Sequence, residues 1–245
     1  MTTSDRYERQ RKLTKIGELG QHKLAKAQVL IIGLGGLGSA AAMQLASAGV
    51  GRLILNDFDI VETHNLPRQL IHRPATVGEL KTDSARQTLK ALNPDCEIRL
   101  LSHQLDEQEL ATEVEQANIV LDCSDNYESR FLINKICHRY KTALVYGAAI
   151  RLEGQTSIFL QQEDAPCYAC IYNDSEQADE DCAGEGVLAS LPAIIGEMQA
   201  LQAILYLTDN LEKHEPALLL FDASRLNWQE IRLQRNPACT VCSEA

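Results

Sequence analysis

A glycine-rich sequence near the N-terminus has the composition and setting of a phosphate-binding loop. Residues 33–38 read Gly-Leu-Gly-Gly-Leu-Gly, directly after an apolar run and before a stretch of small residues typical of a helix. Glycines let the backbone approach a phosphate, and the N-terminus of the helix offers free N–H groups and partial positive charge. Asp57 follows the next apolar run, at the distance expected for a ribose-binding carboxylate. A tight turn with a surface aspartate is the alternative, and the loop alone does not distinguish NAD, FAD and ATP.

The polar segment after Asp57 adds groups that a hydride-transfer enzyme does not need. Its sequence over residues 64–69 is His-Asn-Leu-Pro-Arg-Gln, and Lys81 follows at the start of a predicted helix. The guanidinium of Arg68 can bind two phosphate oxygens together, and Lys81 can add a point charge. Taken singly, Arg68 also fits a surface loop, Lys81 an exposed helix start, and His64 a local hydrogen bond.

Asp125 comes just past an apolar run that reads as a strand, in the sequence Asp122-Cys-Ser-Asp-Asn126. Ligands of open α/β sheets bind at the carboxyl ends of the strands. A carboxylate there can bind Mg²⁺, which takes few protein ligands and binds phosphates as well. The alternative for Asp125 is an N-cap of the next helix. Asp122 fits a structural role better.

Four of the eight cysteines form two Cys-x-x-Cys pairs, at Cys167 and Cys170 and at Cys239 and Cys242. Four thiolates in two pairs match a tetrahedral structural zinc site, although the pairs are farther apart than in a compact zinc ribbon. Redox dithiols or disulfides are the alternatives, and neither pair begins a thioredoxin-like helix. We therefore expect zinc to tie the C-terminus to the segment that follows a mid-chain strand.

Cys182 stands apart from the other cysteines, in an acidic segment that reads as a loop. A loop thiol can act as a nucleophile or carry a persulfide. The neighbouring acids should raise its pKa, so an incidental thiol is an equal alternative. Cys96, Cys123 and Cys137 lie in apolar or helical surroundings and are expected to be buried thiols.

The elements that must position these groups alternate between strands and helices in the first part of the chain. Strands are predicted over 29–33, 52–56, 96–101, 119–123 and 143–147, with helices over 38–48, 79–92, 107–116 and 126–140. This alternation predicts an α/β, Rossmann-like fold with a mostly parallel sheet covered on both faces. After residue 150 we expect antiparallel strands over 156–160, 217–221 and 230–234, a helix over about 190–207 and a polar loop over 161–189.

The bulk composition is that of one globular domain with an acidic surface. The chain has 245 residues, of which 45% are hydrophobic and 23% charged, and its formal net charge is -11. This charge disfavours nucleic acid and anionic membranes as main partners. The first residues lack an apolar signal segment, and no apolar run reaches the ~20 residues of a membrane span. We therefore expect a cytoplasmic protein with a single domain over 1–245.

Together, the motifs resemble those of the MoeB/ThiF family of ubiquitin-activating-enzyme-like adenylyltransferases. The similarity covers nearly the whole chain, in motifs that share one order along it: Arg-Tyr-Glu-Arg-Gln (6–10), the glycine loop, Asp-Phe-Asp (57–59), Asn-Leu-Pro-Arg-Gln (65–69), Lys81, Asp-Cys-Ser-Asp-Asn (122–126), Gly-Ala-Ala-Ile-Arg-Leu-Glu-Gly-Gln (147–155) and both cysteine pairs. Pro67 departs from the glutamine that is frequent in the family.

The resemblance implies an enzyme that uses ATP to adenylate the C-terminal glycine of a ubiquitin-like sulfur-carrier protein ending in Gly-Gly. Residues 1–150 would bind the nucleotide, and residues 151–245 would bind the carrier and zinc. The nucleotide contacts implied by the family pattern are Gly33, Gly35, Gly36, Asp57, His64, Asn65, Leu66, Pro67, Arg68, Lys81, Asp125 and Asn126.

The same resemblance assigns chemical roles to a smaller set. Arg68 and Lys81 would act on the phosphates, and Asp125 would bind Mg²⁺. Arg9 would reach the ATP site of the partner subunit in a homodimer, and Cys182 matches a cysteine that some members use in sulfur transfer. The sequence contains no rhodanese-like extension, so a separate protein would donate the sulfur.

The identity of the carrier stays open at this stage. Residues 147–155 look more like the molybdopterin-synthase type, and the acidic run before Cys182 leaves the thiamine type open. Two other classes compete: an NAD-dependent oxidoreductase, which explains only the glycines and Asp57, and a noncatalytic nucleotide-binding adaptor with a zinc clip.

Overall fold

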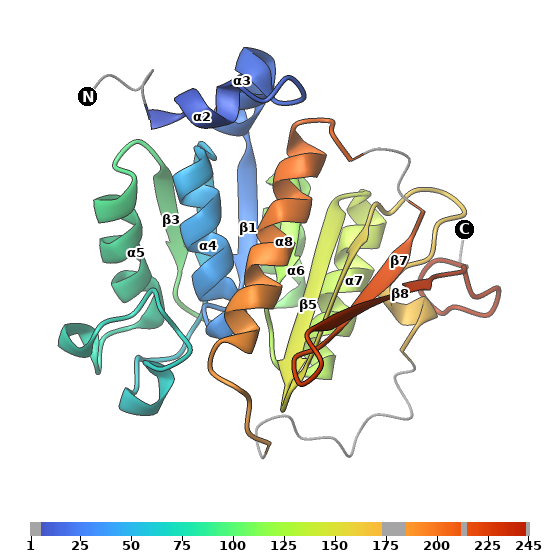
Figure 1. Cartoon of the computed structure of the whole chain (residues 1–245). Helices are drawn as coiled ribbons and strands as arrows, with labels where there is room; N and C mark the ends of the chain where they lie inside the picture. The colour runs from blue at the N-terminus through green and yellow to red at the C-terminus, as the bar shows by residue number, and fades with distance from the viewer. Residues whose placement is uncertain (1–5, 173–184, 212–214, 244–245) are drawn as a thin grey trace.

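The computed structural model describes residues 6–172, 185–211 and 215–243. One eight-stranded sheet runs through them in the order β3-β2-β1-β4-β5-β6-β7-β8 (Figure 1). The strands are β1 (Gln28–Ile32), β2 (Arg52–Asn56), β3 (Glu97–Leu101), β4 (Ile119–Asp122), β5 (Ala143–Ile150), β6 (Glu153–Phe159), β7 (Ala217–Asp222) and β8 (Asn227–Arg232). Pairing is parallel from β3 to β5 and antiparallel from β5 to β8, which confirms the predicted fold class.

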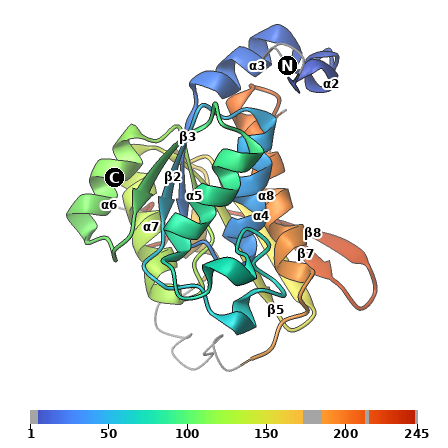
Figure 2. The ribbon, with the colours of Figure 1, turned by 90° about the vertical axis from the view of Figure 1, so that its left-hand side faces the viewer.

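Helices cover both faces of the parallel part of the sheet. On one face lie α4 (Gly36–Ala48), α5 (Lys81–Leu92) and α8 (Leu191–Leu207); on the other lie α6 (Glu107–Gln116) and α7 (Tyr127–Tyr140) (Figures 1 and 2). Since β1, β2 and β4 are buried on both sides, their residues are almost continuously apolar, as expected for parallel strands. Each face of the sheet therefore has its own hydrophobic core.

Two short helices precede the sheet and were not predicted. The helices α2 (Glu8–Arg11) and α3 (Gly17–Lys26) lie at the end of the sheet where β1 begins (Figure 1). Gln10 donates a hydrogen bond to the carbonyl of Ala48 at the C-terminal end of α4, at 3.2 Å. Because α4 has 13 residues, its two ends are about 20 Å apart at about 1.5 Å per residue. The segment that carries Arg9 is therefore remote from the glycine loop of its own chain.

The second part of the chain agrees with the predicted pattern and adds detail. Strand β8 begins earlier than expected, and all of its residues are exposed. The expected polar loop contains a 3-10 helix, η3 (Tyr168–Cys170); two others, η1 (Thr63–Asn65) and η2 (Pro74–Thr76), lie between β2 and α5. Among the described residues, no helix combines the length and apolar character that a membrane span requires.

Candidate active site

A cavity of about 1300 Å³ opens at the edge of the sheet where the parallel strands end. Ligand cavities commonly measure about 300–1,000 Å³, so this one has room for a nucleotide and for part of a second molecule. Most of the residues predicted to bind a nucleotide lie along it, namely Gly33, Gly35, Gly36, Asp57, His64, Asn65, Arg68, Lys81, Asp125 and Asn126. Leu66 and Pro67 are not among the lining residues. The fold thus brings together groups that are dispersed over some 90 positions of the sequence.

The glycine loop makes a sharp turn from β1 into α4. Gly33 has a φ of 91°, and a Cβ on it would lie 2.6 Å from the carbonyl oxygen of Cys123. A Cβ on Gly38 would lie 1.9 Å from the carbonyl oxygen of Gly33. Both clashes are with backbone, so neither position tolerates a side chain. The first turn of α4 carries no acidic residue, which leaves its unpaired N–H groups suited to an anion.

Asp57 orients the glycine loop from the end of β2. Its Oδ2 accepts the N–H of Leu34 at 2.7 Å, and its Oδ1 accepts the N–H of Asp59 at 2.9 Å. Burial raises the pKa of the Asp57 carboxyl, and the positive charge of Lys81 and these two N–H groups act in the opposite direction. A carboxylate held in this way keeps further lone pairs for hydroxyl groups of a ligand in the cavity.

Lys81 is buried, contrary to the alternative of an exposed helix-start lysine. Its side chain is 9% exposed, and Nζ lies 2.7 Å from Oδ2 of Asp59 and 3.9 Å from Oδ2 of Asp57. The backbone supports this placement, because the N–H of Lys81 donates to the carbonyl of Asp59 at 2.9 Å. A buried ammonium at the rim of the cavity is a fixed positive charge for phosphate oxygens.

The segment between β2 and α5 holds its polar side chains in a compact turn. The buried Asn65 accepts the N–H of Glu62 at 3.1 Å, and Arg68 donates to the carbonyl of His64 at 2.9 Å. His64 is exposed and lies 3.6 Å from Glu62, which agrees with a local role. Gln69 is buried along the cavity, and its Oε1 has no hydrogen-bond partner among the described residues. The sequence analysis included Gln69 in the motif 65–69 but assigned it no contact with the nucleotide.

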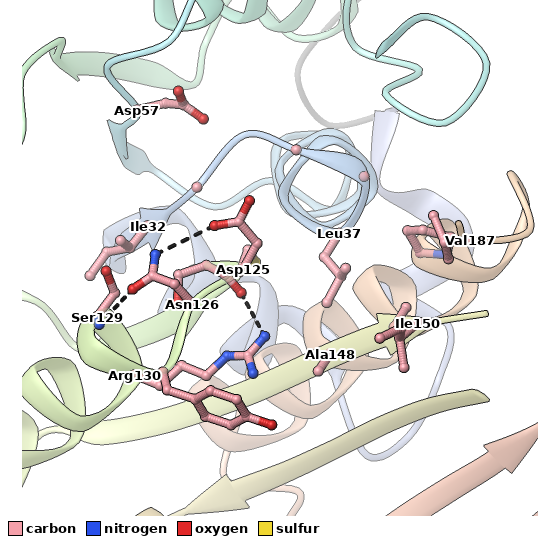
Figure 3. Close-up of a pocket in the computed structure, with 18 of the residues that line it drawn as sticks. Ile32, Leu37, Asp57, Asp125, Asn126, Ser129, Arg130, Ala148, Ile150 and Val187 are labelled. Atoms are coloured by element: carbon pink, nitrogen blue, oxygen red, sulfur yellow. Dashed lines mark hydrogen bonds between the residues drawn. The ribbon is translucent and has the colours of Figure 1, made fainter. Parts of the chain in front are cut away.

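Two acids at the C-terminal end of β4, Asp122 and Asp125, differ in their surroundings. Asp122 is buried, its Oδ1 accepts the N–H and hydroxyl of Ser124, and burial raises its pKa. Asp125 is exposed and accepts only a long bond, at 3.4 Å, from Asn126 among the hydrogen bonds described (Figure 3). Asn126 caps α7 by accepting the N–H of Ser129 at 2.9 Å. Asn126 therefore takes the capping role, and Asp125 is open to bind a cation such as Mg²⁺.

The cavity continues beyond the parallel strands onto β5 and β6. Ala148, Ala149 and Gly154 line this part, and the short side chains of the two alanines take up little of its space. Gln155 donates to the hydroxyl of Tyr146 at 2.8 Å and accepts the hydroxyl of Tyr172 at 2.8 Å. Local sequence does not indicate this polar chain, because Tyr146 and Gln155 meet only when β5 and β6 pair and Tyr172 comes from the segment after η3.

The two cysteine pairs meet at one point, as predicted. The Sγ atoms of Cys167, Cys170, Cys239 and Cys242 all lie within 4.8 Å of one another. The contact from Cys167 to Cys239 is 3.7 Å, and that from Cys170 to Cys242 is 3.4 Å. Tetrahedral zinc with four bonds of about 2.3 Å separates its sulfurs by about 3.8 Å, whereas a disulfide bond is about 2.0 Å. This cysteine cluster therefore has the dimensions of a zinc site.

Polar N–H groups surround the cysteine cluster. The backbone N–H of Asn236 donates to Cys170 at 3.4 Å, and that of Val241 donates to Cys239 at 3.5 Å. The side-chain amide of Asn134, from α7, donates to Cys167 at 3.5 Å. Such donors stabilise thiolates, which are the form that binds a metal. The remaining thiols of Cys96, Cys123 and Cys137 are buried, as expected.

Arg9 does not join the cavity of its own chain. Arg9 is exposed on α2 and is absent from the lining of the cavity, which agrees with its position beyond the far end of α4. Cys182 lies outside the described residues.

Comparison with known families and curated proteins gives consistent matches over the whole chain. The ThiF family model matches residues 7–241. A molybdopterin-synthase adenylyltransferase from Escherichia coli is 43% identical over 239 residues, which are 98% of this chain and 96% of that protein. A SAMP-activating enzyme E1 from Haloferax volcanii is 36% identical over 99% of this chain and 90% of its own length.

Two further comparisons concern a longer relative and a solved structure. An adenylyltransferase and sulfurtransferase MOCS3 from Anopheles gambiae is 40% identical, and the match covers 98% of this chain and 55% of that protein. The crystal structure of Escherichia coli MccB with ATP has a TM-score of 0.85 over 98% of this chain and 74% of that one. Its sequence identity is 22%, so this likeness supports the fold.

Proposed function

Because the chain belongs to the ThiF family, we propose that it adenylates the C-terminal glycine of a ubiquitin-like sulfur-carrier protein for molybdopterin biosynthesis. Relatives named molybdopterin-synthase adenylyltransferase, from Escherichia coli and Salmonella typhimurium, are 43% and 41% identical and match 98% of the chain. These names favour adenylation over the NAD-dependent and noncatalytic alternatives. The thiamine-pathway carrier is the alternative substrate.

One observation carries the proposal: a single cavity of about 1300 Å³ extends from the proposed phosphate-binding groups onto strands β5 and β6. The glycine loop, Asp57, Arg68 and Lys81 lie in the first part, and the short side chains of β5 and β6 line the second. An adenylating enzyme must hold ATP and a carboxylate end to end. The continuity of the two parts meets that requirement.

The nucleotide would bind through the groups at the strand ends. Gly35 and Gly36 would contact ATP through their backbone, and Asp57 would accept the ribose hydroxyls. Asn65, Arg68 and Lys81 would bind the phosphates. Asp125 would bind Mg²⁺. When bound, this ion would offset the negative charge of the phosphates.

The reaction needs charge compensation and positioning. A carboxylate oxygen of the carrier forms a bond to the α-phosphorus of ATP, the bond from that phosphorus to its bridging oxygen breaks, and pyrophosphate leaves. The carboxylate is already ionised, so no general base is required. It is a weak nucleophile that the phosphate oxygens repel, and Arg68 and Lys81 offset this repulsion as charge moves to the leaving group.

We also propose that the protein forms a homodimer, because Arg9 cannot reach the nucleotide site of its own chain. Its helix lies at the far end of α4, about 20 Å from the glycine loop. In a dimer Arg9 would enter the site of the partner subunit. Mixing Arg9→Ala with Asp125→Ala protein tests this arrangement, since each mixed dimer would contain one intact site. Recovery of activity on mixing supports it, and inactive mixed dimers contradict it.

Sulfur transfer would follow adenylation, and we propose a separate protein as the sulfur donor. The terminal sulfur of a persulfide on the donor would attack the glycyl carbonyl and displace AMP, which forms an acyl disulfide. A second thiol would then attack the donor's sulfur and cleave this S–S bond, so that the thiocarboxylate leaves and a disulfide between donor and thiol remains. The cysteine cluster is proposed to bind a structural zinc ion that fixes the segment after β6 to the segment after β8.

Exchange of radiolabelled pyrophosphate into ATP tests the proposal and identifies the carrier. Exchange should depend on a carrier that ends in Gly-Gly and be faster with the molybdopterin-type carrier than with the thiamine-type carrier. The reverse preference would reassign the pathway. Absence of exchange with both carriers, together with NADH binding, would contradict adenylation.

A further inference from the structure

A buried histidine, His72, lies behind the cavity wall. It connects three segments that line the cavity, although its own side chain is not among the lining residues. His72 is 5% exposed and follows the turn that contains Asn65 and Arg68. Its Nε2 lies 3.2 Å from the carbonyl oxygen of Leu34, and its Nδ1 lies 3.0 Å from Oγ of Ser84. The sequence analysis assigned it no role.

Hydrogen bonding and burial together define the state of this ring. A carbonyl oxygen only accepts, so Nε2 must carry the proton. Burial lowers the pKa of His72 to about 4, so the ring is neutral near pH 7 and Nδ1 is an acceptor. Ser84 therefore donates to Nδ1, and its Oγ accepts from Oγ1 of Thr76, at 2.7 Å. The one hydroxyl proton of Thr76 is then shared with the carbonyl of Arg73, 3.0 Å away. We call the chain from Leu34 through His72 to Ser84 the relay; both of its hydrogen bonds are made in this tautomer.

The relay restrains the peptide units on which the glycine loop depends. The N–H of Leu34 donates to Asp57 at 2.7 Å, and its carbonyl accepts from His72. Gly35 and Gly36 follow directly. On the opposite side of the ring, Ser84 belongs to α5, one turn after Lys81.

We propose that His72 is a positioning residue that fixes the glycine loop relative to the Arg68 turn and the Lys81 helix, and so sets the affinity for ATP. This role rests on the proposed function, since it presumes ATP as the ligand. The carbonyl of Leu34 also accepts the hydroxyl of Ser39, at 3.3 Å. Loss of the imidazole therefore leaves that buried carbonyl with one donor, and the effect falls on the placement of the loop.

Two substitutions separate the two nitrogens. His72→Gln can place an amide N–H where Nε2 lies and keep the bond to Leu34. His72→Asn can place an oxygen where Nδ1 lies, keeping the bond to Ser84 and losing the one to Leu34. Thr142→Val is the matched stability control. Thr142 directly precedes β5, and the substitution removes its buried hydrogen bond of 3.1 Å to the carbonyl of Val114 in α6.

The experiment measures kcat and KM for ATP in pyrophosphate exchange, with thermal unfolding of each protein. His72→Asn should raise the KM for ATP about tenfold, the effect of losing one well-placed hydrogen bond. His72→Gln should stay within about threefold of the wild type, and Thr142→Val should lower the melting temperature while leaving the KM unchanged. Equal KM values for the Asn and Gln variants, or a wild-type KM in His72→Asn, would overturn the positioning role.

Two measurements keep the inference separate from folding defects and from the proposed reaction. Nitrogen-15 spectra of the wild-type imidazoles should contain a neutral ring protonated at Nε2, absent from His72→Gln; an imidazolium or an Nδ1-protonated ring would overturn the relay. If the wild type catalyses no exchange, the proposed function is wrong. Calorimetric measurement of ATP binding then tests the role of His72. The wild type and His72→Gln should bind ATP more tightly than His72→Asn.

Discussion

Replacing Lys81 with methionine tests whether its ammonium compensates the buried charge of Asp57. Methionine keeps most of the length of the side chain and removes the charge. At an effective dielectric constant of about 20, two unit charges 3.9 Å apart attract each other by about 4 kcal/mol. The variant no longer buries an ammonium group, so the desolvation cost of that group is saved and offsets part of the lost attraction. We therefore expect Lys81→Met to lower the free energy of unfolding by about 2 to 3 kcal/mol at neutral pH.

The pH dependence identifies the cause. Burial already raises the pKa of Asp57 above the ordinary value of 3.8, and loss of Lys81 raises it further. A carboxyl with a raised pKa in the folded state is destabilising when ionised, and protonation relieves this as the pH falls through that pKa. The defect of Lys81→Met should therefore shrink as the pH is lowered from neutrality towards 3.8.

Urea unfolding of the nucleotide-free protein over a pH series provides the assay. Arg86→Met is the matched control on the same helix, because Arg86 forms an exposed ion pair with Asp83 at 2.7 Å. Exposed pairs contribute at most about 1 kcal/mol, so the control should change little at any pH. A Lys81→Met defect that is constant with pH, or no larger than that of Arg86→Met, would refute the electrostatic reasoning.

The other predictions concern the metal and the chemical steps. Metal analysis should find one zinc ion per chain, as expected for one four-cysteine cluster, and chelation should lower the melting temperature; metal-replete protein without zinc would exclude the site. Arg68→Ala and Asp125→Ala should fold normally yet slow pyrophosphate exchange on the order of 10²-fold or more, and near-normal exchange in either would remove that residue from the mechanism. Cys182→Ala should retain exchange, because attack on the α-phosphorus needs no thiol; if thiocarboxylate formation alone is lost, Cys182 transfers sulfur, and loss of exchange would contradict its placement after adenylation.

The centre of the parallel sheet was predictable because β1, β2 and β4 are apolar on both faces. Short apolar runs such as 29–33 and 119–123, which alternate with longer helical patterns, are typical of strands at the centre of a sheet between helices. The predicted strands and helices of residues 28–160 agree with the structure to within a few residues. Helix α3 was missed because its ten residues bury only one large apolar side chain, Leu24. Strand β8 was misplaced because all its residues are exposed, so its sequence carries no buried alternation.

The site was predictable where one short motif carries the chemistry and not where partners come from distant segments. Asp57 and Asp125 stand just after predicted strands, and Lys81 stands near the start of a predicted helix. Arg68 belongs to the short polar motif between them. His72 bonds to Leu34, 38 positions away, and Asn134 bonds to Cys167, 33 positions away. Pairing of this kind depends on how elements pack, and local sequence does not record it.

Mass spectrometry of the carrier after incubation with ATP and this protein tests the central claim most directly. The account predicts that a carrier ending in Gly-Gly gains one adenylyl group at its terminal carboxylate, and that a carrier lacking the last glycine gains none. The adduct should be lost in Arg68→Ala and Asp125→Ala and retained in Cys182→Ala. An unmodified Gly-Gly carrier in the presence of active, ATP-bound protein would contradict the account.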